Sequence, residues 1–284
     1  MSYSRRKFLQ TTGLFTAGAM LSANELFASK AALKNFGLQL WSVRDDLAKD
    51  PKGVLKQVAS FGYKQIESFE GAKGMFWGMS PAEFKSLMDD LGMKIISSHC
   101  NINRDFEKKA ADAASIGMKY LICPYKGPQK SIDAFKKFAD EFNAKGEICK
   151  KNGIRFAYHN HGYSFKAIDG EIPEDVMIAN TNPDTVDFEM DMYWVVVGGA
   201  DIEKYLAKYK NRFRLGHVKD RIKNSTEDDA SCILGTGSID YASILPVAKK
   251  YGMEYFIVEQ ERWDNSTPLL SAEADAKYLM NLKV

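Results

Sequence analysis

The four histidines of this 284-residue chain all stand beside short apolar segments. Two of them, His159 and His161, lie where the run at residues 154–158 gives way to polar residues. That run alternates aromatic and β-branched residues after a Lys-Asn-Gly stop, a pattern typical of a buried strand. His99 and His217 end or lie near the end of similar runs. Because α/β proteins bind ligands at the carboxyl ends of parallel strands, the four histidines are predicted to share one rim.

Carboxylates stand at the ends of three further apolar runs. Glu67, Asp191 and Glu259 each follow β-branched or aromatic residues. Histidines and carboxylates that converge from separate strands suit a divalent metal, because imidazole and carboxylate groups bind zinc, manganese, iron and cobalt. Taken singly, Glu67 could be a structural carboxylate and His99 a hydrogen-bonding wall residue. Lys219 would suit a polar or anionic substrate, or would neutralise the carboxylates beside it.

The segments that must position these residues alternate between two patterns. Short β-branched or aromatic runs are followed by longer segments with apolar residues at helical spacing, and glycines such as Gly62 and Gly153 end the helical segments. Eight such units predict an α/β fold, a single (β/α)8 TIM barrel. An open doubly wound sheet is the alternative, but it usually has fewer strands and a Gly-rich turn after the first. The predicted strands are residues 36–40, 63–68, 93–99, 119–123, 154–159, 185–191, 213–218 and 255–259.

The composition limits the classes of function. The chain has 39 basic and 37 acidic residues and a net charge of +2. It has no basic stripe interleaved with aromatic residues, so nucleic acid is not an expected partner. Its four cysteines contain no C-x-x-C pair, which argues against a thiolate zinc cluster or a dithiol redox motif. A disulfide between two of them stays open.

The first 30 residues have the parts of a secretory leader. Arg5 and Arg6 precede a short apolar run at residues 11–21 and a small-residue exit near Ala28, as in a twin-arginine signal. The apolar run is too short for a bilayer core of about 30 Å, so no stable membrane span is expected. An amphipathic first helix is the alternative. The sequence predicts a signal peptide over residues 1–30, a barrel domain over residues 31–284 and export to the periplasm.

Seven strand-end motifs together resemble the xylose isomerase-like TIM barrel superfamily. They are GLQLWSVR, GYKQIESF, SSHCNI, AYHNHGYSF, DMYWVVVGGAD, GHVKD and VEQER, spread over residues 35–284. The closer resemblance is to the sugar phosphate isomerase/epimerase branch, which also holds inosose dehydratases, ketose 3-epimerases and keto-glycoside lyases. The resemblance implies a small-molecule sugar or keto-sugar substrate. Barrels of this branch are often dimers, so a homodimer is also an expectation.

The resemblance further implies a metal held by the last four strands. In that family a glutamate, an aspartate, a histidine and a glutamate from these strands bind the metal. By motif the last three correspond to Asp191, His217 and Glu259, while His159 stands where related sequences carry the first glutamate. Trp194 replaces a histidine found in many epimerases. The implied cofactor is a divalent metal: manganese, zinc, cobalt, iron or magnesium.

The implied chemistry is proton abstraction next to a keto-sugar carbonyl, which forms an enediolate. Sugar isomerase/epimerase activity is the family's default, with Glu259, His161 and His99 as the predicted catalytic residues. Because His159 breaks the usual glutamate pair, a keto-sugar dehydratase, hydratase or keto-glycoside lyase is the alternative. A non-catalytic carbohydrate-binding barrel is the competing class. The predicted substrate-binding residues are Trp41, Arg44, Glu67, Lys219 and Arg262.

Overall fold

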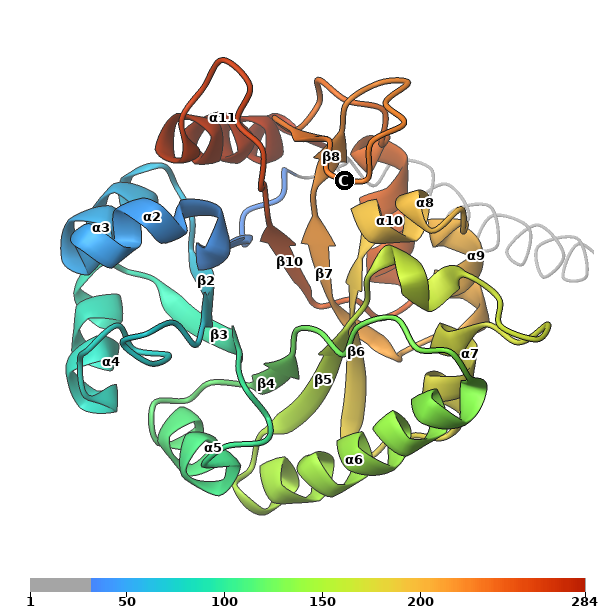
Figure 1. Cartoon of the computed structure of the whole chain (residues 1–284). Coiled ribbons are helices and arrows are strands. Elements are labelled where there is room, and N and C mark those ends of the chain that lie inside the picture. The colour runs from blue at the N-terminus through green and yellow to red at the C-terminus, as the bar shows by residue number, and fades with distance from the viewer. Residues whose placement is uncertain (1–31, 284) are drawn as a thin grey trace, which may run out of the picture.

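Eight parallel strands close into a barrel in this computed structural model, which describes residues 32–283 (Figure 1). Every predicted strand overlaps an observed one, so the TIM barrel is confirmed and the doubly wound alternative is wrong. The predicted leader lies outside the described residues. The barrel strands are β1 (Gly37–Gln39), β2 (Gln65–Phe69), β3 (Lys94–His99), β4 (Tyr120–Cys123), β5 (Arg155–His159), β6 (Val186–Asp191), β7 (Phe213–Val218) and β10 (Tyr255–Val258).

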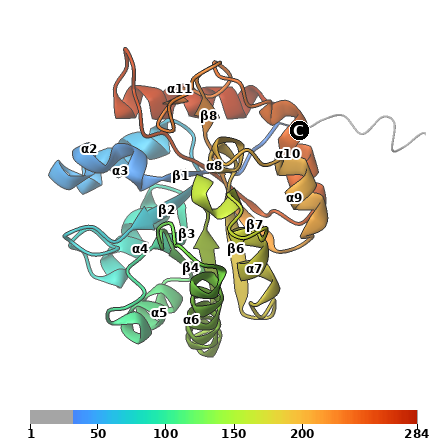
Figure 2. The same ribbon diagram turned by 45° about the vertical axis from the view of Figure 1, so that its right-hand side comes forward.

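Helices surround the barrel, as Figures 1 and 2 show from two directions. Their first residues follow standard capping chemistry: Ser80 and Glu83 form a capping box, and the Asp50 side chain accepts a hydrogen bond from the backbone of Gly53. Within residues 32–283, none of the helices combines the length and the apolar character that a bilayer span requires. The helices are η1 (Leu40–Val43), α2 (Arg44–Lys49), α3 (Pro51–Ser60), α4 (Pro81–Asp90), α5 (Phe106–Ser115), α6 (Ile132–Lys151), η2 (Gly162–Phe165), α7 (Pro173–Ala179), α8 (Met192–Val197), α9 (Ile202–Lys208), α10 (Tyr241–Lys250) and α11 (Pro268–Asn281).

The interior of the barrel changes from apolar to polar along the strands. A small buried cluster, separate from the main core, includes Ala157 and Leu215. Side chains two residues apart on a strand point to the same face, so His159 follows Ala157 and His217 follows Leu215 into the interior. All four side chains are buried. The strand period therefore stacks a polar layer on an apolar one at the carboxyl ends of the strands.

Two buried glutamates lie opposite irregularities in the neighbouring strands. The register between β2 and β3 shifts between Ile66 and Glu67, and the register between β6 and β7 shifts between Phe188 and Glu189. The extra residues, Ile96 and Arg214, belong to β3 and β7, so β2 and β6 keep their regular alternation. Both glutamates are fully buried. The period of two on their own strands therefore places these carboxylates inside the barrel.

A short antiparallel ribbon follows β7 at the same end of the barrel. It consists of β8 (Asp220–Arg221) and β9 (Ser231–Cys232). The Asp220 carboxylate accepts hydrogen bonds from the backbone amides of Gly235, Gly237 and Ile239. A single buried side chain thus holds the whole loop after the ribbon. All four cysteines are free thiols, so the disulfide alternative is not realised.

Candidate metal centre

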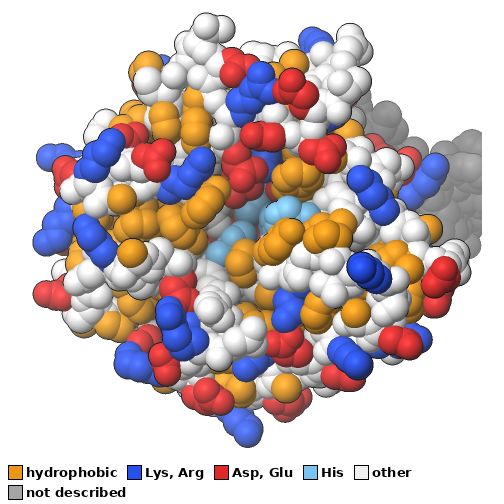
Figure 3. Space-filling view, in the orientation of Figure 1, with side chains coloured by type: hydrophobic (Ala, Val, Ile, Leu, Met, Phe, Trp, Pro, Cys, Tyr) orange, Lys and Arg blue, Asp and Glu red, His pale blue; other side chains and the backbone are white. Residues whose placement is uncertain are grey.

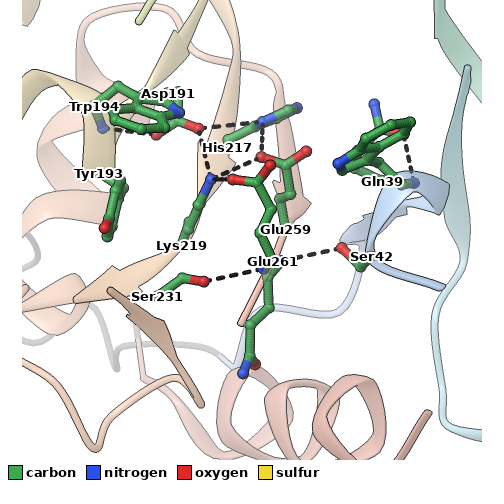
Figure 4. A network of polar contacts seen from close by, with 12 residues as sticks. Gln39, Ser42, Asp191, Tyr193, Trp194, His217, Lys219, Ser231, Glu259 and Glu261 are labelled. Carbon is green, nitrogen blue, oxygen red and sulfur yellow. Dashed lines mark hydrogen bonds and ion pairs between the residues drawn. The ribbon is translucent and has the colours of Figure 1, made fainter. Parts of the chain in front are cut away.

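Four buried side chains from the last four barrel strands meet at one point. This upper quartet consists of His159, Asp191, His217 and Glu259. The Asp191 Oδ2 atom lies 3.4 Å from His159 Nε2 and 3.6 Å from His217 Nδ1. The Glu259 Oε2 atom lies 3.3 Å from the same nitrogen of His217. Figure 4 shows Asp191, His217 and Glu259 pointing toward one another.

The spacing of these atoms suits a metal ion better than direct hydrogen bonds. A tetrahedron with metal–ligand bonds of about 2.0–2.1 Å has edges of about 3.3–3.4 Å. The separations in the upper quartet, 3.3 to 3.6 Å, are close to that value. Among the described residues, His159 Nε2, Asp191 Oδ2 and His217 Nδ1 are buried without a hydrogen-bond partner. Since buried polar atoms are normally satisfied, the donor set fits a divalent cation.

In both histidines of the upper quartet, the ring nitrogen that points away from the centre already has a hydrogen-bond partner. His159 Nδ1 lies 3.2 Å from the carbonyl oxygen of Pro124, which can only accept, so Nδ1 donates and Nε2 keeps its lone pair. His217 Nε2 lies 2.8 Å from Glu67 Oε1. In the neutral ring, a proton donated there leaves the lone pair on Nδ1, facing Asp191 and Glu259. Without a metal, Glu189 and Glu259 outweigh the effect of burial and raise the pKa of His217 well above its usual range, so Nδ1 then carries a proton that a metal would replace. Metal-binding histidines are oriented by such outer partners in other proteins.

A second set of two histidines and two carboxylates lies beneath the first and shares His217. This lower quartet consists of Glu67, His99, Glu189 and His217. His99 Nε2 lies 2.8 Å from Glu189 Oε2 and 3.1 Å from Glu67 Oε1. Glu67 also accepts hydrogen bonds from Gln39 and Ser97. The lower quartet is therefore a hydrogen-bonded ion cluster.

Charge pairing dominates the lower quartet despite its burial. Burial alone would lower the pKa of His99, but Glu67 and Glu189 outweigh it and raise the pKa to about 10. Burial opposes ionisation of Glu67 as well, yet His99 and His217 hold the pKa of this carboxyl well below its usual range. His99 is thus an imidazolium held between two carboxylates. Glu67, in turn, is an ionised acceptor for His217.

A buried lysine neutralises part of the upper quartet. Lys219 Nζ lies 3.2 Å from Glu259 Oε2, 3.9 Å from Asp191 Oδ2, and in contact with Glu261 (Figure 4). Burial would lower the pKa of Lys219, but Glu259 and Asp191 raise it above its usual range. The pKa of Glu259 is lowered, because Lys219 and His217 overcome the effect of burial. For Glu261, burial and the neighbouring Glu259 raise the pKa.

The upper quartet opens into a cavity of about 870 Å³. Figure 3 shows histidine side chains at the floor of this hollow, bordered by apolar and acidic side chains. This volume falls in the range of small-molecule sites. Besides His159 and Glu259, its walls include Trp41, Phe69, Glu70, His99, Cys100, Asn101, Ile102, Asn103, Cys123, Pro124, Tyr125, Lys126, Gln129, Phe138, His161, Trp194 and Glu261.

The structure brings the four predicted metal ligands together and places three other predicted residues on the cavity wall. Those three are Trp41, His99 and His161. The ring of His161 lies 4.9 Å from that of Tyr125 and 5.3 Å from that of Trp194. Burial, with a smaller effect of His159, lowers the pKa of His161 to about 3. A neutral imidazole is a poor proton donor, so this environment suits His161 to hydrogen bonding rather than to acid catalysis.

The other predicted substrate-binding residues do not line the cavity. Glu67 belongs to the lower quartet, and Lys219 is covered by Glu259 and Glu261. The guanidinium of Arg44 stacks 4.7 Å from the ring of Trp41 and 5.0 Å from that of Trp263. Arg262 pairs with Glu227 and Asp264. Their predicted direct contact with substrate stays a prediction, and the positive charges of both arginines are already engaged.

Sequence reasoning missed one carboxylate of this centre, Glu189, and placed Glu261 on the rim without giving it a role. Glu189 lies two residues before Asp191, and Glu261 lies two residues after Glu259. Because a strand has a period of two, each shares the face of its recognised neighbour. That spacing was the available signal for Glu189.

The fold and the site together define a class: a parallel barrel with imidazole and carboxylate donors for a metal at the carboxyl ends of its strands. A family model described as "Xylose isomerase-like TIM barrel" matches residues 55–282. This match covers most of the chain. The chain therefore belongs to the xylose isomerase-like TIM barrel family.

Curated relatives of this chain share one name. The inosose dehydratase of Salmonella agona is 26% identical over 173 residues, which cover 55% of this chain and 56% of that protein. The chain thus matches about half the length of this relative. The inosose dehydratase of Geobacillus kaustophilus is 22% identical over 253 residues, or 74% of this chain and 79% of that protein. These relatives are dehydratases by name, so the findings support an enzyme but not an isomerase specifically.

Solved structures extend the likeness over the whole barrel. A sugar phosphate isomerase/epimerase from Parabacteroides distasonis is 29% identical, with a TM-score of 0.75, and the match covers 89% of this chain and 96% of that one. A protein named IOLI, solved with a bound zinc atom, is 15% identical with a TM-score of 0.73. That match covers 88% of this chain and 99% of the other, and shows the shared fold.

Proposed function

We propose that this protein is a metal-dependent lyase that removes a proton beside the carbonyl of a keto sugar or keto polyol and expels an oxygen group from the next carbon. The observation that carries this proposal is that Glu261 stands on the cavity wall beside Glu259, which belongs to the upper quartet. Glu259 and Glu261 come from the same strand end. Epimerisation by paired carboxylates needs one on each face of the reacting carbon, whereas elimination can use both on one face.

The environments of these two glutamates suggest separate roles. Glu259 is ionised and suits a proton acceptor, whereas the raised pKa of Glu261 suits a proton donor. The C–H proton passes to Glu259, the carbon–oxygen bond breaks, and the leaving oxygen takes a proton from Glu261. Lys219 contacts both carboxylates and keeps them in place. A divalent metal bound by the upper quartet would polarise the substrate carbonyl as a Lewis acid.

One feature of the relatives supports this reading, and another supports the alternative. The curated relatives named above are dehydratases, which are eliminating enzymes. The isomerase/epimerase alternative draws support from the Parabacteroides distasonis structure, whose match spans nearly the whole barrel. Both reactions begin with the same proton abstraction. They differ in whether an oxygen group leaves.

Solvent exchange distinguishes the two reactions. Metal-loaded protein is incubated with keto sugars in deuterated water and followed by NMR. We expect loss of one C–H signal together with a new unsaturated product, and a Glu261→Gln variant should slow product formation more than exchange. Exchange with inversion at one carbon and no elimination would instead establish an epimerase. Failure of every keto sugar to exchange would reject both.

We also propose export through the twin-arginine route, on the basis of Arg5 and Arg6. Replacing both by lysine keeps the charge but alters the paired arginines that such signals carry. Cell fractionation of the full chain with an epitope tag after Val284 measures the outcome. We expect the original protein in the periplasmic fraction and the doubly substituted one in the cytoplasm. Equal distribution of the two would remove the proposal.

A further inference from the structure

The ammonium group of Lys219 has more donors than the surrounding carboxylates accept. The side chain is 1% exposed, so bulk water does not complete its surroundings. Its Nζ atom donates to Glu259 Oε2 at 3.2 Å and to Glu261 Oε2. Asp191 Oδ2, at 3.9 Å, is beyond hydrogen-bond range. An ammonium group has three N–H donors, so one of them has no oxygen acceptor within residues 32–283.

Two aromatic rings lie beside this ammonium group. Its Nζ atom is 4.9 Å from the ring centroid of Tyr193 and 5.1 Å from that of Trp194 (Figure 4). Both distances are within the roughly 6 Å over which a ring face attracts a cation. The centroids of the two rings are 5.2 Å apart, with 89° between the ring planes. The rings therefore form a corner, here called the aromatic corner, that faces the ammonium in place of a third oxygen.

The start of α8 fixes both rings beside a metal ligand. Asp191 caps this helix, because its Oδ1 atom accepts a hydrogen bond from the backbone amide of Trp194 at 2.9 Å. The Oδ2 atom of the same carboxylate lies toward His159 and His217. Four consecutive residues thus supply one metal ligand and the aromatic corner. Replacing either aromatic side chain keeps this cap, since a backbone amide forms it.

The hydroxyl group of Tyr193 holds its ring from the far end. It donates to the carbonyl oxygen of Asp228 at 2.5 Å and accepts from the amide of Ala230 at 2.7 Å. Both partners belong to the segment that joins β8 and β9. The guanidinium of Arg221 lies 5.7 Å from the same ring. Tyr193 is fully buried and does not line the cavity, so its ring contacts Lys219 without reaching the substrate space.

The backbone of Lys219 is fixed independently of its side chain. The hydroxyl of Tyr241, on α10, donates to the carbonyl oxygen of Lys219 at 2.7 Å and accepts from its amide at 2.8 Å. The remaining freedom of this lysine lies in its flexible four-carbon stem. The aromatic corner restricts that freedom, because an ammonium that swings away gives up its contact with both rings.

The carboxylate of Glu261 depends on Lys219 for its position. The backbone amide of Glu261 donates to Ser231 Oγ at 3.0 Å, which fixes the main chain. In the part of the chain that the structure describes, Lys219 is the one hydrogen-bond and ion-pair partner of the carboxylate. The Glu261 side chain is 29% exposed and stands on the cavity wall. A movement of the ammonium would therefore free this carboxylate to turn within the cavity.

We propose that Tyr193 and Trp194 are positioning residues that hold the ammonium of Lys219 against Glu261. The aromatic corner and the carboxylates share one ammonium group, and the lysine in turn directs the Glu261 carboxyl toward the substrate. This inference rests on the proposed elimination, in which Glu261 gives its proton to the leaving oxygen. It assigns a role in that step to two residues outside the upper quartet.

The kinetic test separates the ring of Tyr193 from its hydroxyl group. Elimination is measured for metal-loaded Tyr193→Leu, which lacks the ring, and Tyr193→Phe, which keeps it. We expect Tyr193→Leu to lower kcat about tenfold and to change KM less than about twofold, because the ring is outside the cavity. Tyr193→Phe should keep most of the original kcat. Equal losses in both variants would assign the effect to the hydroxyl and its loop, and would overturn the role of the ring.

Tyr209→Leu is the matched control. Lys208 Nζ lies 4.9 Å from the ring of Tyr209, the same separation as between Lys219 and Tyr193, but the Lys208 side chain is 54% exposed. Water can replace a ring at such a site, so we expect kcat to stay unchanged. If Tyr193→Leu does not fold, Trp194→Leu and Trp194→Phe make the same comparison with the second ring.

Nuclear magnetic resonance tests the contact without turnover and so separates this inference from the proposed function. In zinc-loaded protein with isotope-labelled lysine, the ε-methylene signal of Lys219 is the one that Lys219→Arg removes. Ring currents should place it upfield of the exposed lysines. We expect Tyr193→Leu and Trp194→Leu to shift it back toward them, and the phenylalanine variants to preserve it.

The two readouts have distinct failures. A Lys219 signal that both leucine variants leave in place would overturn the aromatic corner, while the lyase would stand if elimination is observed. The expected shift in a protein that eliminates no substrate would support the aromatic corner and reject the lyase.

Discussion

The upper and lower quartets contain the same kinds of side chain, but they differ in the distances between histidine nitrogens and carboxylate oxygens. Each consists of two histidines and two carboxylates, and His217 belongs to both. In the lower quartet His99 lies within 3.1 Å of both carboxylates. In the upper quartet the ion-pair contacts among the four side chains measure between 3.3 and 3.6 Å. The contacts of His99 are therefore hydrogen bonds, whereas those of the upper quartet, like the 3.5 Å contact between His217 and Glu189 in the lower quartet, are longer.

The difference shows why residue types alone do not define a metal centre. In the lower quartet, hydrogen bonds connect the nitrogen and oxygen atoms. Ion pairing there offsets the free-energy cost of burying the charges. In the upper quartet the protons of His159 and His217 are committed to Pro124 and Glu67. Their other ring nitrogens face carboxylate oxygens. Without a metal, the carboxylates raise the pKa of His217 well above its usual range, and a protonated His217 together with Lys219 balances their charge. A bound cation would take the place of the proton on His217.

The test with the largest expected effect replaces one carboxylate of each quartet by the corresponding amide. Asp191→Asn removes a charged donor of the upper quartet but keeps an oxygen that can still accept from the amide of Trp194 at the start of α8. We expect metal affinity to fall at least about a hundredfold, since even the outer partners of ligands change affinity by 10–100-fold. Titration calorimetry with Zn²⁺ or Mn²⁺ measures the change.

Glu189→Gln is the matched control, because Glu189 lies on the same strand two residues earlier. We expect this variant to bind the metal within a few-fold of the original protein. If the control lost the metal and Asp191→Asn kept it, the assignment of the two quartets would have to be exchanged.

A second substitution tests the connection between the quartets. Glu67→Gln weakens the acceptor that orients His217 and leaves His99 with one carboxylate. We expect about a 10–100-fold loss of metal affinity together with a loss of stability of roughly 3–5 kcal/mol. Metal titration and urea unfolding measure the two effects separately. Loss of stability without any change in metal affinity would show that Glu67 does not act through His217.

A buried carboxylate outside both quartets sharpens the comparison, because among the described residues no cation pairs with it. Neither oxygen of Glu174, on α7, has a hydrogen-bond partner among the described residues. Burial raises the pKa of Glu174 to about 8. The folded state keeps the proton between pH 4.5 and pH 8 while the unfolded chain releases it, so stability contributed by this group falls as the pH rises through that window.

Glu174→Gln should remove this pH dependence. We expect the variant to melt roughly 5 °C higher than the original protein at pH 8.5 and at nearly the same temperature at pH 4.5. Thermal unfolding followed by circular dichroism across this range gives the comparison. A constant difference at all pH values would mean that the Glu174 carboxyl does not titrate as described.

The sequence predicted the barrel and most of its rim because both depend on local periodicity. Alternating apolar runs identified the strands, and the polar residues that end them had to lie on one edge of a parallel sheet. His159, Asp191 and His217 were found in this way, with the family resemblance selecting them as ligands. Local patterns were sufficient here, since a strand end fixes the position of its side chain.

Features that depend on contacts between distant segments were not predictable. The register shifts opposite Glu67 and Glu189 involve hydrogen bonds between strands, which no single segment encodes. Arg44 was expected at the substrate, but Trp41 and Trp263 enclose its guanidinium. The cavity wall after β3 is formed by a loop whose shape depends on a buried partner, since Lys109 donates to the carbonyl oxygen of Asn101. Contacts between segments that are distant in the sequence determine each of these features.

The position of Lys219 has a consequence for how strongly the centre holds an ion. Asp191 and Glu259 contribute two negative charges, and the ammonium group within 3.9 Å of both contributes one positive charge. These groups leave a single net negative charge, since Glu261 is the proton donor of the proposed reaction. The lysine thereby acts as an internal counterion that lowers the attraction between the two carboxylates and a bound cation.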